Sequence, residues 1–120
     1  FLSNFNGSVL PQSDILGKVM LIDTPGVLCG KKQSRDRSYS FLDATKWFAD
    51  RADMILLLFD AHKLDISDEF KELMQTIRPH NVEKIRCVLN KADGVSKEQL
   101  VRVYGSLMWG LEGYLKRQKL

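Results

Sequence analysis

Residues 85–93 read IRCVLNKAD, and this stretch decides the fold. Its apolar run leads directly into a polar tetrapeptide, Asn-Lys-Ala-Asp, at 90–93. A second apolar run ends in a similar way, since residues 19–26 read VMLIDTPG. Near-continuous apolar runs of this kind are typical of strands in a parallel sheet that is covered on both faces. We therefore expect buried strands at 18–23, 54–60 and 84–90.

Helical periodicity lies between and after these runs. We expect helices over about 34–52 and 66–77, and a last helix opened by a capping box of Ser96 and Gln99. Residues 1–16 are expected to form a short helix and a loop. The alternation of strands and helices predicts a doubly wound α/β fold. The expected inner faces are Phe41, Ala44, Thr45, Phe48 and Ala52; Ile66, Phe70, Leu73, Met74 and Ile77; and Leu100, Val103, Tyr104, Leu107, Leu111 and Leu115.

Each of the three expected strands ends in a polar residue, namely Asp23, Asp60 or Asn90. Ligands of open α/β sheets bind outside the carboxyl ends of the strands. These residues therefore predict a polar edge at the ligand site. Asp60 either lines that edge or caps a turn, and we favour the cap.

Asp23, Thr24, Pro25 and Gly26 match the phosphate-sensing signature of P-loop nucleotide hydrolases. In this interpretation, Asp23 contacts Mg²⁺ indirectly, through a water molecule. Gly26 points its backbone N–H at the γ-phosphate, because glycine permits close approach. The same residue types are common in ordinary turns. The second motif downstream, in the right order, favours nucleotide binding.

Asn90, Lys91 and Asp93 match the base-recognition motif NKxD. The Asp93 carboxylate can accept two hydrogen bonds from a purine edge, and the Lys91 stem can cover the base plane. Asn90 is expected to tie loops together. The alternative is a polar loop of the kind found after strands in many α/β proteins, but the pattern at a strand end favours a base site.

A phosphate-cradling loop of the form G-x-x-x-x-G-K-[ST] is expected upstream of Asp23 and is absent from this chain. Gly30 and Lys31 resemble such a loop, but the glycine spacing is one residue short and no Ser or Thr follows. We interpret residues 26–39 as a switch segment. Val27 stands where many small GTPases carry a water-positioning Gln, so the catalytic residues are unknown.

The composition indicates one globular domain, with 44% hydrophobic and 28% charged residues. The net charge of +3 is too small to indicate nucleic-acid binding. No apolar run approaches the roughly 20 residues of a membrane span. Cys29 and Cys87 are expected as reduced thiols of a cytosolic protein. His62 and His80 are expected in loops, without metal-ligand partners at a useful spacing.

Trp109 is expected to be exposed on the last helix. It stands nine positions after Leu100, which places it on the opposite face at about 100° per residue. Aromatic residues are enriched at protein interfaces. We therefore assign Trp109 to a dimer interface, although partial burial against another part of a longer protein is the alternative.

Five stretches together resemble the EH domain-containing proteins, a group of dynamin-related ATPases. The run at 58–70 is the most specific of them, and the resemblance covers essentially the whole chain. The stretches are LIDTPG at 21–26, WFADR at 47–51, LFDAHKLDISDEF at 58–70, VLNKAD at 88–93 and RVYGSLMW at 102–109.

The resemblance implies a P-loop NTPase-like fold, a dynamin-type G domain with a three-layer sandwich and a mostly parallel sheet. It implies that residues 1–120 are one part of that domain, without the P-loop, the helical membrane-binding domain or the EH domain. The family binds ATP with Mg²⁺, dimerises through the G domain and contacts membrane lipids through its other domains. The implied setting is cytoplasmic and peripheral on endosomal membranes, in endocytic recycling and membrane trafficking.

Two alternatives differ in class from a membrane-remodelling ATPase. NKxD classically reads guanine, so the first is a GTP-specific switch GTPase. The second is a protein-interaction or structural module, which the missing P-loop favours for the 120 residues alone. We expect those residues alone not to hydrolyse ATP or GTP, because the P-loop supplies much of the positioning and charge stabilisation.

Overall fold

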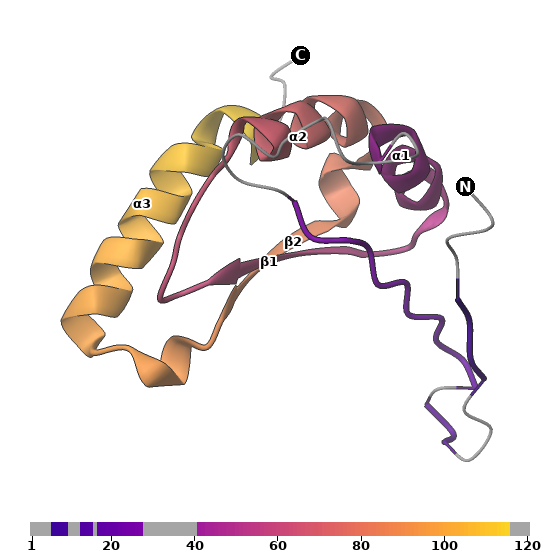
Figure 1. Cartoon of the computed structure of the whole chain (residues 1–120), viewed down its shortest axis with the longest axis horizontal. Helices are drawn as coiled ribbons and strands as arrows, with labels where there is room; N and C mark the ends of the chain where they lie inside the picture. Colours follow the sequence, from indigo (N-terminus) through magenta and orange to yellow (C-terminus); the bar gives the residue numbers. More distant parts are fainter. Residues whose placement is uncertain (1–5, 10–12, 16, 28–40, 116–120) are drawn as a thin grey trace.

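The structure, a computed structural model, describes residues 6–9, 13–15, 17–27 and 41–115 (Figure 1). Its regular elements follow one another as helices and strands in alternation. They are α1 (Phe41–Arg51), β1 (Ile55–Asp60), α2 (Asp68–Asn81), the 3-10 turn η3 (Val82–Lys84), β2 (Ile85–Asn90), the 3-10 turn η4 (Ala92–Gly94) and α3 (Lys97–Leu115).

β1 and β2 form a parallel pair, with Ile55 opposite Ile85 and Asp60 opposite Asn90. A parallel pair needs a crossover connection, and α2 supplies it. The strands expected at 54–60 and 84–90 are therefore confirmed, each beginning one residue later than expected. The α/β class is confirmed as well, with a two-stranded sheet in the described part of the chain.

The strand expected at 18–23 is wrong for this structure. Residues 17–27 carry no regular structure, and Met20 and Leu21 are 85% and 78% exposed. A strand needs a neighbour to satisfy its backbone N–H and C=O groups. In the described residues the sheet consists of β1 and β2 alone, so the apolar run has no strand to pair with. Residues 6–9 and 13–15 contain no helix, and the rest of the segment 1–16, where a short helix was expected, lies outside the described residues.

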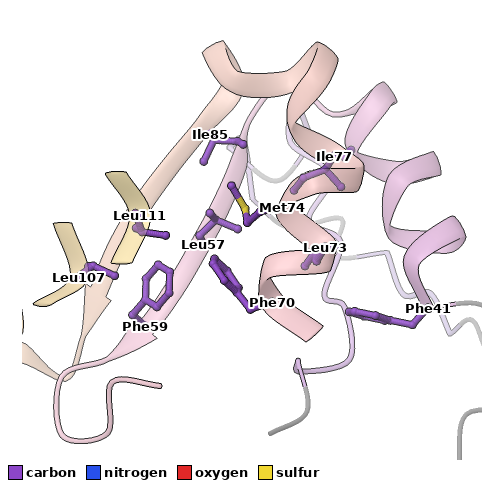
Figure 2. Close-up of a cluster of buried hydrophobic side chains, with 11 residues drawn as sticks. Phe41, Leu57, Phe59, Phe70, Leu73, Met74, Ile77, Ile85, Leu107 and Leu111 are labelled. Atoms are coloured by element: carbon purple, nitrogen blue, oxygen red, sulfur yellow. The ribbon is translucent and has the colours of Figure 1, made fainter. Parts of the chain in front are cut away.

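The core lies between α2 and β1 (Figure 2). Phe70 and Met74 of α2 point toward Leu57 of β1, and the Phe59 and Phe70 rings meet edge to face at 5.4 Å. Leu107 and Leu111 of α3 join the same cluster beside Phe59. Phe41 and Ala49 of α1 also belong to the cluster. This cluster joins residues of all three helices and both strands in one core.

α2 buries the face that its spacing predicts. Ser67 caps its N-terminus, where the hydroxyl accepts a hydrogen bond from the Phe70 N–H at 3.2 Å. The helix runs past Pro79 to Asn81, four residues beyond the expected end, so His80 is helical rather than in a loop. Phe70, Leu73, Met74 and Ile77 are buried, while Ile66 precedes the helix and is half-buried.

Asn81 stabilises the C-terminal end of α2, beyond Pro79. Its side chain is 1% exposed, and its amide nitrogen donates to Asp50 Oδ1 at 2.9 Å and to the Ile77 carbonyl at 2.8 Å. The first bond joins α2 to the end of α1. Lys84 completes this junction, because its ammonium donates to the carbonyls of Ala49 and Asp50, each at 3.4 Å.

The inner face of α1 is only partly as expected. Phe41 is buried, while Ala44, Thr45, Phe48 and Ala52 are half-buried. Ala49, which was not expected there, is buried and belongs to the core cluster. Residues 34–40, the expected start of this helix, lie outside the described residues.

α3 begins at the expected capping box, but its expected inner face is only partly buried. Ser96 and Gln99 form the capping box, with bonds of 3.1 and 3.2 Å. Leu107 and Leu111 are buried, and Leu100 and Val103 are half-buried. Tyr104, however, is 59% exposed. The reason is that α3 approaches α2 only toward its C-terminal end (Figure 1).

At Gly110, α3 lies close to another part of the chain. A Cβ atom at this position would clash with Ile66 Cδ1. The Ile66 side chain therefore occupies the space that a side chain at position 110 would take. This contact joins α3 to the loop between β1 and α2.

Met74→Ala is expected to lower the free energy of unfolding by about 2–5 kcal/mol, because Met74 is fully buried and its removal leaves a cavity. Urea unfolding followed by circular dichroism measures the change. Met108→Ala is the matched control, since Met108 is 47% exposed and its loss should cost under about 1 kcal/mol. Equal losses in the two variants would contradict the core described above.

Candidate nucleotide-binding site

Two of the three predicted polar strand ends meet in the structure. Asp60 and Asn90 are register partners at the carboxyl ends of β1 and β2, and the Ala61 N–H donates to the Asn90 carbonyl at 3.0 Å. Asp23 does not join them in the sheet. Residues 23–26 lie in an exposed, irregular segment that precedes Val27.

Val27 has a packing role that the sequence analysis missed. It is half-buried and contacts the hydrophobic core. An apolar side chain here anchors the end of the exposed segment that carries Asp23, Thr24, Pro25 and Gly26. The assignment of these four residues to phosphate and Mg²⁺ stays a prediction.

The NKxD motif forms a tight turn directly after β2. Lys91 has a left-handed backbone, with φ 58° and ψ 28°, which non-glycine residues adopt at a cost. Asn90 Oδ1 accepts a hydrogen bond from the Lys91 N–H at 3.0 Å, and the Lys91 carbonyl accepts one from Gly94 at 3.1 Å. Asn90 therefore ties the turn to β1 through its carbonyl and supports the turn through its side chain.

Asp60 connects the ends of both strands. Its Oδ2 lies 2.6 Å from Lys91 Nζ, and its Oδ1 accepts a hydrogen bond from the His62 N–H at 2.8 Å. The second bond confirms the predicted turn cap. The hydrogen bonds from Lys91 and His62 hold the pKa of Asp60 below its ordinary value.

The contact between Asp60 and Lys91 was missed by the sequence analysis. The two residues are 31 positions apart, and only the parallel register brings them together. A signal was nevertheless present: a carboxylate ends one strand, and a lysine directly follows the end of the other.

η4 packs closely against the turn after β1. A Cβ atom at Gly94 would lie 2.6 Å from Nε2 of His62, so glycine at this position permits the close approach. In the described part of the chain, no cluster of three His, Cys, Asp or Glu residues could hold a metal ion. His62 is best explained by this contact and by its backbone bond to Asp60.

Asp93 is exposed and is the middle residue of η4. Among the described residues, nothing forms an ion pair or a hydrogen bond with its carboxylate. An exposed carboxylate three residues after the end of β2 is a hydrogen-bond acceptor of the kind that the edge of a purine base requires. The assignment of Asp93 to a base site stays a prediction.

Trp109 is exposed, as expected, with 82% of its surface accessible. Leu107 and Leu111, two positions away on either side, are 4% and 1% exposed. The helix register that placed Trp109 away from the core is therefore confirmed. Its part in a dimer stays a prediction.

Of the two cysteines, only Cys87 lies among the residues that the structure describes. Cys87, on β2, carries a free thiol whose pKa is raised by burial of part of its surface. Cys29 lies outside the described residues, as does most of the expected switch segment at 26–39. No helix in the described ranges is both long and apolar enough to cross a bilayer.

A parallel β–α–β unit whose second strand leads into NKxD is typical of GTPase-type nucleotide-binding folds. The sequence profile of the dynamin family matches residues 8–92. The chain is 58% identical to EH domain-containing protein 2 of Arabidopsis thaliana and 53% identical to EH domain-containing protein 1 of Homo sapiens, each over 111 residues. Each alignment covers 92% of this chain and 20% of the relative.

The chain therefore belongs to the dynamin family, and within it to the EH domain-containing proteins. It spans about a fifth of the length of the curated relatives that it matches. This agrees with the resemblance noted from the five sequence stretches.

Lys91→Met is expected to raise the pKa of Asp60 toward its ordinary value, because the Lys91 ammonium is the main cause of the depression. A depressed carboxyl pKa contributes stability above the unfolded-state pKa, and this contribution is lost as pH falls through the folded-state pKa. Carboxyl-detected NMR titration between about pH 2 and pH 6 measures the shift. Lys97→Met, at an exposed lysine of α3, should leave Asp60 unchanged. An Asp60 pKa that is the same with and without Lys91 would rule out the ion pair in solution.

Proposed function

We propose that this chain forms the central part of the nucleotide-binding domain of an ATP-hydrolysing, membrane-remodelling protein. The observation that carries the proposal is the NKxD turn, held at the carboxyl end of β2 beside the end of β1. Membership of the EH domain-containing proteins supports it. The proposed setting is endocytic recycling and membrane trafficking, on the cytoplasmic face of endosomal membranes.

The base is proposed to bind at the NKxD turn. The exposed Asp93 carboxylate accepts two hydrogen bonds from the base edge, and the Lys91 stem covers the base plane. Asn90 holds the turn in place through the bonds described above. Asp93 and Lys91 are exposed, and the hydrogen bonds made by Asn90 are already present without a nucleotide.

The phosphates and Mg²⁺ are proposed to bind near residues 23–26, with Asp23 contacting the ion through water. Mg²⁺ supplies charge neutralisation on the phosphate oxygens. A P-loop segment from elsewhere in the whole protein completes the site, and the complete domain is a three-layer sandwich with a mostly parallel sheet. Exposed apolar residues support a larger sheet: Leu56 and Leu58 of β1 are 52% and 62% exposed.

Adenine and guanine nucleotides are distinguished by competition. A whole protein that contains this chain and a P-loop is titrated with a fluorescent ATP analogue and then with unlabelled ATP or GTP. Displacement by ATP at lower concentration supports the ATPase. Preferential displacement by GTP supports a GTP-specific switch GTPase, and no binding of either nucleotide supports an interaction module.

Asp93→Ala is expected to weaken nucleotide binding in the same protein. Loss of charge-assisted hydrogen bonds costs about 1.5–3 kcal/mol, or more than tenfold in affinity. Calorimetry with ATP and Mg²⁺ measures the change, and Asp53→Ala, at an exposed aspartate before β1, is the control. Unchanged affinity in Asp93→Ala would remove this residue from the site.

Trp109→Ala is expected to shift a homodimer toward monomer with the fold intact. An exposed aromatic anchor typically contributes ~2 kcal/mol or more to association. Light scattering at matched concentrations measures the change, with circular dichroism to confirm folding. Trp47→Ala removes another partly exposed tryptophan, on α1, and should leave the dimer intact.

Equal dimer fractions in wild type and Trp109→Ala would exclude Trp109 as an anchor. Because dimerisation is proposed to precede assembly on membranes, liposome-stimulated ATPase activity should fall as well.

A further inference from the structure

The Lys91 side chain is held on one side of the NKxD turn. Its ammonium lies 2.6 Å from Asp60 Oδ2, although the side chain as a whole is 61% exposed. A lysine in this setting would otherwise sample many rotamers. The ion pair directs its stem toward the end of β1.

Asp60 is itself held firmly. Its backbone lies in β1 opposite Asn90, its carbonyl accepts a hydrogen bond from Lys63 at 3.2 Å, and its Oδ1 accepts one from His62 at 2.8 Å. Its side chain is 34% exposed, about half as exposed as that of Lys91. The carboxylate is therefore a fixed point to which a flexible lysine is attached.

The ion pair has a second consequence for the base site. Asp93 is two residues from Lys91, and a mobile ammonium would be attracted to its carboxylate. Among the described residues, no cation forms an ion pair with the Asp93 carboxylate. Because Asp60 holds the Lys91 ammonium, the Asp93 carboxylate is left available to a base.

We propose that Asp60 is a positioning residue of the base site: it sets the Lys91 stem along the base plane and keeps the Lys91 ammonium away from Asp93. This inference rests on the proposed function. Asp60 acts through Lys91 and touches no nucleotide atom. Its contribution is preorganisation, which lowers the ordering cost of binding.

The test compares Asp60→Asn, Lys91→Met and the double variant in the whole protein that binds nucleotide. Asparagine keeps an oxygen that can accept from the His62 N–H, so the turn should stay folded while the charge is lost. ATP affinity is expected to fall roughly three- to tenfold in Asp60→Asn, in line with the loss of one charged interaction. Tripolyphosphate, which has no base, should bind the variant as it binds wild type. Asp65→Asn, at an exposed aspartate of the next loop, is the control.

The double variant separates positioning from a general structural effect. If Asp60 acts through Lys91, Asp60→Asn should cause no further loss of ATP affinity in the Lys91→Met background. Additive losses, an equal loss of tripolyphosphate affinity, or unchanged ATP affinity in Asp60→Asn would each overturn the proposal.

A measurement without nucleotide keeps this inference apart from the proposed function. In amide NMR spectra of the chain itself, Asp60→Asn should shift the signals of Lys91, Ala92 and Gly94, whereas Asp65→Asn should not. Unchanged signals would overturn the inference whatever the nucleotide binding. A wild-type protein that binds neither ATP nor GTP contradicts the proposed function, and the NMR result then still decides whether Asp60 positions Lys91.

Discussion

The parallel register of β1 and β2 is the constraint on which the rest of the structure depends. Six residue pairs, from Ile55–Ile85 to Asp60–Asn90, align the two strand ends. A shift of one residue would turn Leu57 and Phe59 away from the core and separate Asp60 from Lys91. The hydrophobic face of α2 favours this register, because Phe70, Met74 and Ile77 form one buried cluster with the inward-facing strand residues Leu57, Phe59 and Ile85. The core and the site are therefore specified by the same contacts.

Much of the fold could be predicted because the signals for β1, β2, α2 and the start of α3 are local. An apolar run with a polar end, or a Ser96–Gln99 capping box, needs no distant partner to be recognised. The run at 18–23 carried the same signal and did not form a strand, because backbone pairing depends on a neighbour that its own sequence does not encode. Tyr104 has the spacing of a core residue, and its exposure depends on how far α3 lies from α2.

The candidate site, too, could be predicted from the sequence only in part. Asn90, Lys91 and Asp93 could be identified from a tetrapeptide, and the structure places them in one turn. The bond between Asp60 and Lys91 could not, since it links positions 31 residues apart and arises only when two strands are aligned. The left-handed backbone of Lys91 was equally hidden, because lysine has no preference for that conformation and the surrounding bonds impose it.

The close packing of Gly110 against Ile66 limits how α3 can move. Ile66 Cδ1 fills the space beside this glycine, and the loop that carries Ile66 begins at the end of β1. A shift of α3 toward that loop at Gly110 would therefore have to displace the Ile66 side chain. Trp109 directly precedes Gly110, so a partner that binds this exposed tryptophan would lie one residue away from the contact with Ile66. The exposed surface of α3 is thus connected, through the contact between Gly110 and Ile66, to the loop that begins at the end of β1.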